Sequence, residues 1–257
     1  MNNSKKRIWN GTAELISCTH TAAKSIFLKI KADIIAKSVT AGQFVYIKTS
    51  GASEPLLRRA FSVMDADPAK GVIELYIDVK GPGTESLAAL TKGDHIDLMG
   101  PLGRGFQKNT FTENNILVGG GCGVAPLIML AKEIKRSGKK VTFCYGGRTK
   151  AQLVFIPILK KLADNLIITT DDGTAGHKGV ITKFIDTKHT YSVYSCGPKP
   201  MLKALSAIFP NAYVALETEM ACGIGVCMGC TVPMASGGYK RCCTEGPVFS
   251  ASEVLWN

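Results

Sequence analysis

The feature most able to do chemistry is a group of five cysteines, of the nine in this 257-residue chain, within residues 217–249. Cys222, Cys227 and Cys230 follow one another in C-x4-C-x2-C order, and Cys242 and Cys243 come after a short polar, hairpin-like segment. This is the plant-type spacing for four thiolates that bind a [2Fe–2S] cluster. The intervening glycines allow a loop to wrap closely around an inorganic core. The spacing therefore predicts a [2Fe–2S] cluster.

The fourth ligand is one of two adjacent cysteines. Cys243 begins the run C-x-x-G-P, whose Gly246-Pro247 turn would hold its thiolate toward the loop, whereas Cys242 would point the other way in an extended segment. We take Cys243 as the ligand. One alternative is a structural zinc site, which more usually shows two separate C-x2-C pairs. The other is a pair of disulfides, which needs an oxidising compartment that nothing else in the chain supports.

Composition and charge limit the class of protein. The chain is 46% hydrophobic and long enough for two ordinary domains. Its basic N-terminus has no apolar segment after it, so we expect no secretory signal and a cytoplasmic location. Glycines and a proline interrupt the longest uncharged stretch, residues 114–131, so we expect no membrane-spanning helix. The net charge of +11 is scattered, without a nucleic-acid-binding signature, so we expect no nucleic-acid partner.

Residues 8–104 have the pattern of short strands separated by turn residues, which is typical of an antiparallel barrel. The expected strands cover residues 11–18, 25–31, 42–48, 60–64, 72–79 and 95–99. Only residues 85–89 have a helical pattern in this part.

Two motifs in this barrel could bind a ligand. In the run 58–62, RRAFS, arginine forks suit phosphates and the aromatic ring suits a flat ligand. Taken alone, so short a string favours the simpler interpretation of a core phenylalanine beside solvated arginines. In the run 80–87, a glycine turn leads into a short helix. That geometry offers backbone amides and a hydroxyl to a pyrophosphate.

From residue 105 the pattern changes to strands that alternate with helices, which predicts a parallel doubly wound sheet. The expected strands are 116–118, 140–145, 166–170, 191–196 and 212–216, and the expected helices are 126–137, 153–163, 181–185 and 199–208. The ligand of such a sheet lies at the carboxyl ends of the strands.

Two turns occupy that edge. The first contains Gly120, Gly121, Gly123 and Pro126 between a strand and a helix, a context that makes a glycine-rich turn a candidate nucleotide site. The second contains Cys196, Gly197 and Pro198. Cys196 is either a contact to the nicotinamide or a small buried hydrophobe.

The expected barrel, the nucleotide domain and the iron–sulfur tail follow one another along the chain. With this order of parts, the chain resembles the ferredoxin reductase superfamily. More narrowly, it is similar over essentially its whole length to the family of electron-transfer subunits of class 1B dihydroorotate dehydrogenases. The motifs that carry the resemblance are 59–62 (RAFS), 81–84 (GPGT), 119–126, 170–173 (TDDG), 196–198 (CGP), 220–222 and 243–249. The cysteine-rich tail is the specific part.

The resemblance implies three domains: an FAD-binding β-barrel at residues 1–104, an NAD-binding α/β domain at 105–216 and a [2Fe–2S] domain at 217–257. It also implies which residues bind the cofactors. The flavin residues would be Arg59, Ala60, Phe61, Ser62, Tyr76, Ile77, Asp78, Gly83 and Thr84. Asp172 would join the two glycine turns in the nucleotide site, and Cys222, Cys227, Cys230 and Cys243 would hold the cluster.

The implied function is electron transfer between NAD(H), FAD and the cluster, without acid–base catalytic residues. The partner would be the FMN-containing catalytic subunit of dihydroorotate dehydrogenase, in a heterotetramer with two copies of each subunit that acts in pyrimidine biosynthesis. Arg148, where a ribose-binding acid is usual, leaves NADP open as the nucleotide, although the resemblance favours NAD. The alternatives are a flavin and iron–sulfur subunit of another oxidoreductase and a non-redox, zinc-stabilised nucleotide-binding module.

Overall fold

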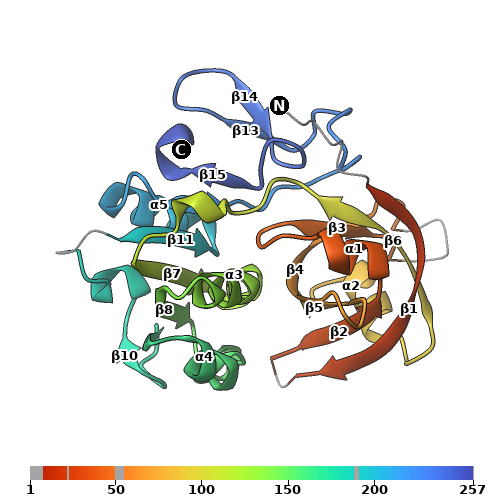
Figure 1. Cartoon of the computed structure of the whole chain (residues 1–257), viewed down its shortest axis with the longest axis horizontal. Helices are drawn as coiled ribbons and strands as arrows, with labels where there is room; N and C mark the ends of the chain where they lie inside the picture. Colours follow the sequence, from red (N-terminus) through yellow and green to blue (C-terminus); the bar gives the residue numbers. More distant parts are fainter. Residues whose placement is uncertain (1–7, 22, 50–54, 188–190, 257) are drawn as a thin grey trace.

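A computed structural model describes residues 8–21, 23–49, 55–187 and 191–256. Two bodies lie side by side, and the C-terminal segment crosses above both of them (Figure 1). The expectation that the N-terminus is no secretory signal falls on residues 1–7, outside the described residues. No helix in the described ranges is long and apolar enough to cross a membrane.

The first body is a closed six-stranded barrel, which confirms the expected architecture. Its strands are β1 (Trp9–His20), β2 (Ser25–Lys31), β3 (Phe44–Ile47), β4 (Arg59–Asp67), β5 (Val72–Asp78) and β6 (His95–Leu102). They pair antiparallel in the order β1-β2-β5-β4-β3-β6. Successive side chains of a strand point to opposite faces, so Leu28 and Ile30 of β2 enter the core while Lys29 and Lys31 stay in water.

The barrel carries two short helices, α1 (Asp33–Ser38) and α2 (Pro82–Ala88). The expectation of a single helix here was wrong, because α1 was missed. Six residues are too few to show helical periodicity, and α1 is held by burial of Ile35 and Ala36 in the barrel core rather than by a sequence signal of its own. The expected helix at 85–89 corresponds to α2, which begins earlier, at Pro82.

The second body is built on a seven-stranded sheet in the order β10-β9-β8-β7-β11-β12-β15. Its strands are β7 (Asn114–Gly120), β8 (Lys140–Gly147), β9 (Asn165–Thr170), β10 (His177–Lys178), β11 (Ser192–Cys196), β12 (Tyr213–Ala215) and β15 (Val248–Ser250). The strands from β7 to β12 pair in parallel. The chain starts in the middle of the sheet and winds outward in both directions, which confirms the doubly wound fold.

Helices cover both faces of this sheet. The α-helices are α3 (Ala125–Arg136), α4 (Ile156–Leu162) and α5 (Lys199–Ile208), and the 3-10 turns are η1 (Lys108–Thr110), η2 (Gly121–Val124), η3 (Lys150–Gln152) and η4 (Ile181–Phe184). Leu117 and Phe143 pack on the α3 side, whereas Val118 and Cys144 pack on the α5 side. The expected helix at 181–185 is only the 3-10 turn η4, because four residues close a single turn.

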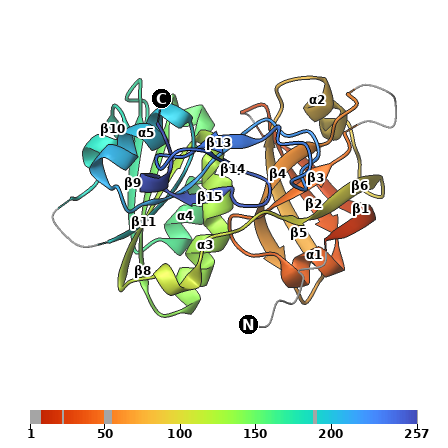
Figure 2. The same cartoon turned by 90° about the horizontal axis from the view of Figure 1, so that it is seen from above.

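The C-terminal segment, residues 217–256, is named the tail here. It contains β13 (Thr231–Pro233), β14 (Tyr239–Arg241), β15 and η5 (Ala251–Glu253), and β13 and β14 form the hairpin expected between the cysteines. Strand β12 was expected to end the sheet, but β15 pairs antiparallel beside it. The tail therefore lies over the junction of the two bodies (Figure 2). The domain boundaries at 104/105 and 216/217 stay predictions.

The two bodies also contact each other directly. Helix α3 packs against strand β4, and Lys132 of α3 pairs with Asp65 of β4. The ring of Phe155 packs edge-on against Tyr76 of β5 with 4.6 Å between ring centroids. These contacts hold the barrel at the edge of the sheet where the parallel strands end.

Candidate functional site

A cavity of about 300 Å³ lies where the barrel, the sheet body and the tail meet, and its size is at the lower end of small-molecule pockets. Eight residues predicted to bind cofactor line it: Ala60, Phe61, Ser62, Tyr76, Ile77, Asp78, Thr84 and Pro126. The sequence motifs of the barrel and the glycine turn of the sheet thus converge on one space, although they are far apart along the chain.

The remaining wall residues were not predicted as cofactor ligands, although Lys80, Cys122 and Ala125 lie within the motifs 80–87 and 119–126. Phe44 and Lys80 come from the barrel, Cys122 and Ala125 from the turn before α3, and Leu216, Glu217, Thr218, Met220 and Pro247 from the tail and its approach. The only sequence signal for Glu217, Thr218 and Met220 was their position just before Cys222. Nothing local marked Phe44, and Pro247 was marked only as part of the turn after Cys243, because both reach the cavity through the packing of separate elements.

The two adjacent arginines of β4 have different surroundings. Arg58 Nη2 donates to both carboxylate oxygens of Asp97, at 2.9 and 3.0 Å, and Nη1 donates to the Asp97 backbone carbonyl at 3.1 Å. Arg59 is exposed, and its Nη1 donates to the carbonyl of Leu57 at 2.6 Å. Within the described ranges Arg59 has no carboxylate partner, so its charge is available to an anion beside Ala60 and Phe61.

The glycine turn after β5 opens helix α2 as expected. Thr84 Oγ1 accepts hydrogen bonds from the backbone N–H groups of Lys80 (2.9 Å) and Gly81 (3.2 Å). Gly83 is buried, and a Cβ atom there would lie 2.8 Å from Thr49 Oγ1. The Thr84 hydroxyl therefore shapes the turn while its residue lines the cavity.

Charged and polar groups gather along one side of the cavity. Lys80 Nζ lies 3.3 Å from Asp78 Oδ2. Burial raises the pKa of the Cys122 thiol to about 12, and the charges of Glu217 and Asp78 add to this, so the thiol stays protonated. Glu217 keeps an exposed surface at the edge of the cavity, yet loss of water on its protein-facing side raises the pKa of its carboxyl.

One polar atom of the wall lacks a partner. Thr218 Oγ1 is buried without a nitrogen or oxygen partner among the described residues, and its one polar neighbour there is the Cys242 thiol, whose pKa it lowers. A buried hydroxyl without a partner costs about 1–3 kcal/mol, so this position suits a polar atom of a ligand. Apolar walls from Phe44 and Phe61 with polar groups at the edge fit a flat ring system such as that of a flavin.

The two glycine turns of the sheet meet at its carboxyl edge. Gly119 of β7 is in register with Cys196 of β11, and a Cβ atom on Gly123 would lie 2.4 Å from the Cys196 carbonyl oxygen. This contact explains why the turn needs glycine. The Cys196 side chain is buried, burial raises the pKa of its thiol, and it does not line the cavity. Its surroundings match the small buried hydrophobe considered for it.

The other predicted nucleotide residues lie near that edge without lining the cavity. Gly120, Gly121, Gly197 and Pro198 belong to the two turns, and a Cβ atom on Gly120 would lie 2.8 Å from Pro198. Asp172 lies in the turn after β9, where its carboxylate accepts hydrogen bonds from the Thr174 N–H (2.9 Å) and hydroxyl (2.7 Å). The structure thus separates Asp172 from the flavin-sized cavity, at the end of a different strand.

The four predicted cluster ligands lie as two pairs, in which the thiol of Cys222 interacts with that of Cys227 and the thiol of Cys243 with that of Cys230. Cys222 Sγ accepts a hydrogen bond from the Cys227 N–H, and Cys230 Sγ accepts one from the Cys243 N–H, each at 3.4 Å. In the described part of the chain, no three His, Cys, Asp or Glu side chains gather around one point that a single ion could occupy. A [2Fe–2S] cluster takes two protein sulfurs on each iron, so the paired arrangement fits a cluster better than one zinc ion.

The loop of residues 222–230, named the cluster loop here, is built to hold thiolates. Burial opposes ionisation of Cys222, but the N–H groups of Cys227, Ile224 and Val226 point at its sulfur and lower its pKa to about 6. Gly223 has φ +70°, and a Cβ atom there would lie 2.7 Å from the ring of Tyr46. The loop can follow this path only with glycine at that position.

The two adjacent cysteines that follow β14, Cys242 and Cys243, have different neighbours. Cys242 Sγ lies 3.4 Å from the Leu216 carbonyl oxygen, and burial raises its pKa to about 11. The Cys243 thiol lies beside that of Cys230, and burial together with this neighbour raises its pKa to about 12. The geometry therefore supports Cys243 as the ligand, as the sequence predicts.

The two sulfur pairs differ in exposure. Cys230 and Cys243 are buried, whereas Cys222 is half-buried and Cys227 is exposed. The exposed side of the cluster loop also carries apolar side chains, with Val226 77% and Met228 52% exposed. One end of the cluster position thus faces the protein core and the other faces solvent.

A buried tyrosine joins the cluster loop to the barrel. The Tyr46 hydroxyl lies 2.8 Å from the Met220 carbonyl and 2.9 Å from the Ala221 carbonyl, and its ring is 1% exposed. Tyr46 pairs with Ala60 across β3 and β4, and Ala60 lines the cavity, as does Met220. The cavity and the first cluster cysteine therefore share one wall.

Comparison with known families assigns each part of the chain to an oxidoreductase domain. The oxidoreductase FAD-binding domain matches residues 13–106, and the oxidoreductase NAD-binding domain matches residues 117–207. The iron–sulfur cluster binding domain of dihydroorotate dehydrogenase B matches residues 217–255. The three matches cover the barrel, the sheet body and the tail.

Relatives that match the whole chain agree with these domain assignments. The electron transfer subunit of dihydroorotate dehydrogenase B (NAD(+)) from Geobacillus kaustophilus is 37% identical over 242 residues, 91% of this chain and 94% of that protein. A homolog of this subunit from Aquifex aeolicus is 38% identical over 250 residues, 95% and 97% of the two chains. Among solved structures, a chain of the NADH-dependent reduced ferredoxin-NADP oxidoreductase, described for flavin-based electron bifurcation, is 31% identical with a TM-score of 0.85, covering 95% of this chain and 90% of that one.

Proposed function

This chain belongs to the family of dihydroorotate dehydrogenase B (NAD(+)) electron transfer subunits, and on that basis we propose which of its residues carry electrons between NAD(H), FAD and a [2Fe–2S] cluster. It is an oxidoreductase subunit with an FAD-binding, an NAD-binding and an iron–sulfur cluster binding domain. The observation that carries the proposal is the shared wall between the cavity and the cluster loop. Met220 lines the cavity, and Cys222 follows two residues later.

We propose that the cavity holds the flavin ring of FAD. Phe44 and Phe61 would exclude water from the flavin ring, and Thr218 Oγ1 would form a hydrogen bond with the polar edge of that ring. The guanidinium of Arg59, which has no carboxylate partner among the described residues, and the turn before α2 would hold the phosphates. FAD, when bound, exchanges two electrons with NAD(H) and single electrons with an iron–sulfur centre.

The nucleotide would approach from the sheet. The turn at Gly120, Gly121 and Gly123 and the segment Cys196, Gly197 and Pro198 form the carboxyl edge that faces the barrel, where a nicotinamide could reach a flavin. Asp172 would contact the far end of the dinucleotide. These assignments, like NAD rather than NADP, rest on the fold and the family.

The chain's role as an electron transfer subunit implies a catalytic partner. We propose that this partner is an FMN-containing dihydroorotate dehydrogenase subunit in a heterotetramer with two copies of each chain, acting in the cytoplasm. Single-electron transfer requires the partner's flavin near the cluster, so we place the docking surface on the exposed side of the cluster loop, around Val226 and Met228.

A second function is favoured by one observation. The solved relative with a TM-score of 0.85 belongs to a bifurcating oxidoreductase rather than to a dihydroorotate dehydrogenase. The chain could therefore serve another catalytic subunit with the same cofactors. Copurification of the natural complex decides between the two partners, because each predicts a different companion chain.

The division of labour is directly testable. In anaerobic stopped-flow measurements, the purified chain with FAD and its cluster should lose its oxidised-flavin absorbance when mixed with NADH. Dihydroorotate should leave that absorbance unchanged, because its oxidation needs the partner's active site. Rapid bleaching by dihydroorotate would contradict the role of a separate catalytic subunit, and no bleaching by NADH would contradict the function as a whole.

A further inference from the structure

An arginine of the tail is held beside the buried sulfur pair. Arg241, at the end of β14, has its Nη1 3.0 Å from the Gly225 carbonyl in the cluster loop. Its Nε lies 3.0 Å from Glu245 Oε2, and the same oxygen accepts the Arg241 backbone N–H at 2.8 Å. The two side chains are 36% and 32% exposed. Arg241 is therefore fixed in orientation by three hydrogen bonds.

The charge of this arginine reaches the cluster ligands. The geometry brings it there, because Gly225, whose carbonyl accepts the hydrogen bond from Arg241 Nη1, lies between Cys222 and Cys227 in the cluster loop. Arg241 pairs with Thr231 across the hairpin, directly after Cys230, and precedes Cys243 by two residues. Arg241 thus carries a permanent positive charge next to Cys230 and Cys243, the buried pair of ligands.

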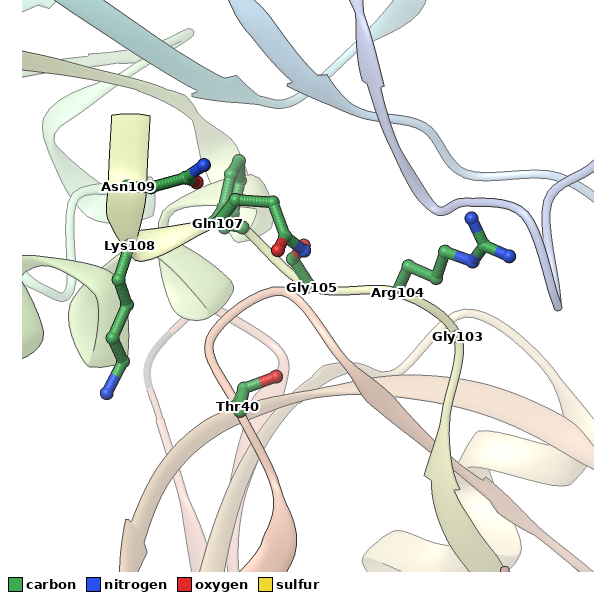
Figure 3. A pocket seen from close by; sticks show the side chains of 8 residues that line it. Thr40, Gly103, Arg104, Gly105, Gln107, Lys108 and Asn109 are labelled. Atoms are coloured by element: carbon green, nitrogen blue, oxygen red, sulfur yellow. The ribbon is translucent and has the colours of Figure 1, made fainter. Parts of the chain in front are cut away.

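A second arginine offsets the negative charge of Glu245. The Arg104 N–H donates to the Gly246 carbonyl at 2.5 Å, so Arg104 is attached directly after Glu245, which itself accepts two hydrogen bonds from Arg241. Arg104 lines a cavity of about 590 Å³ together with Thr40, Gln107 and Lys108, and Figure 3 shows its side chain pointing toward the tail. Two arginines around one carboxylate leave a net positive charge beside the cluster position.

We propose that Arg241 sets the reduction potential of the iron–sulfur cluster by stabilising its reduced form through this fixed positive charge. Reduction adds one electron to the cluster and makes or breaks no bond, so a nearby positive charge favours it. This inference rests on the proposed function, because it requires the cluster. Arg241 does not bind the iron and is a positioning and charge-setting residue.

The test is a potentiometric titration of the full-length, cluster-containing chain, followed by EPR of the reduced cluster. Arg241→Gln should lower the reduced-to-oxidised ratio at a fixed potential by about threefold to tenfold, where tenfold is about 59 mV for one electron. Glu245→Gln, which removes a negative charge and keeps a hydrogen-bond acceptor, should raise the ratio. Arg241→Lys, which keeps the charge, should stay near the wild-type value.

The potential shifts of Arg241→Gln and Glu245→Gln should have opposite signs, which distinguishes an electrostatic effect from a structural one. A loosened loop would expose the cluster in both variants and shift both potentials the same way, which would overturn the inference. Lys240→Gln is the matched control, because Lys240 is adjacent on β14, carries the same charge and pairs with Glu253 instead, at 3.2 Å. A shift in this control as large as in Arg241→Gln would also overturn the inference.

Two further outcomes are distinguishable. If Arg241→Gln fails to retain iron, Arg104→Gln takes its place, with the same expected direction, and an unchanged or raised potential there overturns the inference. A wild-type chain without an iron–sulfur spectrum would overturn the proposed function itself, and this inference with it.

Discussion

Cys242 and Cys243 are neighbours whose sulfur atoms face different surroundings. Cys243 lies beside Cys230, whereas Cys242 points at the Leu216 carbonyl. Serine in place of Cys243 should remove a thiolate ligand and most of the bound iron. Cys242→Ser should keep its iron, because a serine hydroxyl can donate to the same carbonyl. Colorimetric iron assays on the two purified variants check this, and the reverse result would show that the neighbours are misassigned.

The adjacent arginines of β4 give a second prediction at this scale. A charge-assisted hydrogen bond contributes about 1.5–3 kcal/mol, so Arg59→Ala should weaken FAD binding about tenfold to hundredfold. Arg58→Ala should bind FAD normally, because Arg58 is engaged with Asp97, and should lose only about 0.2–1 kcal/mol of stability as a partly exposed ion pair. Flavin titration of the two apoproteins measures the difference. Equal affinities would count against Arg59 as the phosphate ligand.

Among the secondary-structure elements, strand β3 connects the barrel to the cluster loop through one side chain. Tyr46→Phe removes the hydroxyl that the Met220 and Ala221 carbonyls share and keeps the ring against Gly223. We expect a loss of about 1–3 kcal/mol in the free energy of unfolding, together with faster amide hydrogen exchange in residues 220–230. Urea denaturation and exchange mass spectrometry measure the two effects.

Tyr239→Phe is the matched control for this prediction. Tyr239 lies on β14 of the same tail, and it is 68% exposed. Its substitution should leave both the unfolding free energy and the exchange of the cluster loop unchanged. Equal effects of the two substitutions would show that the hydroxyl of Tyr46 does not anchor the loop.

For the whole molecule, the exposed side of the cluster loop is the surface that a partner would cover. Val226→Lys places a charge in the centre of that surface and should weaken the complex with the catalytic subunit by about tenfold or more, because burying an unpaired charge is unfavourable. Bleaching of the flavin by NADH should be unaffected. Calorimetry of the two purified subunits measures the affinity.

Val180→Lys is the control for the docking prediction. Val180 is 51% exposed and precedes η4 in the sheet body, away from the tail. The affinity of this variant for the catalytic subunit should match that of the wild type. If Val226→Lys also binds like the wild type, the docking surface lies elsewhere.

The sequence by itself determined the fold class and the order of the parts, and it predicted which cysteines hold the cluster. Those features follow from local pattern: strand alternation, the change to helical periodicity after residue 105, and the fixed spacing of Cys222, Cys227 and Cys230. The sequence patterns did not predict the shortest elements. Helix α1 and strand β15 have too few residues to show a period, and each is held by the surface on which it packs.

Only the tertiary structure decided which distant residues share a surface. Phe44, Thr218 and Pro247 reach one cavity from three parts of the chain, and Tyr46 meets Met220 across 174 positions. It also gave Arg58 a carboxylate partner, Asp97, and Arg59 only backbone carbonyls among the described residues, and it gave Cys242 and Cys243 different neighbours. The physical reason is that the direction and partner of a side chain depend on the packing of elements, which residue spacing along a chain does not encode.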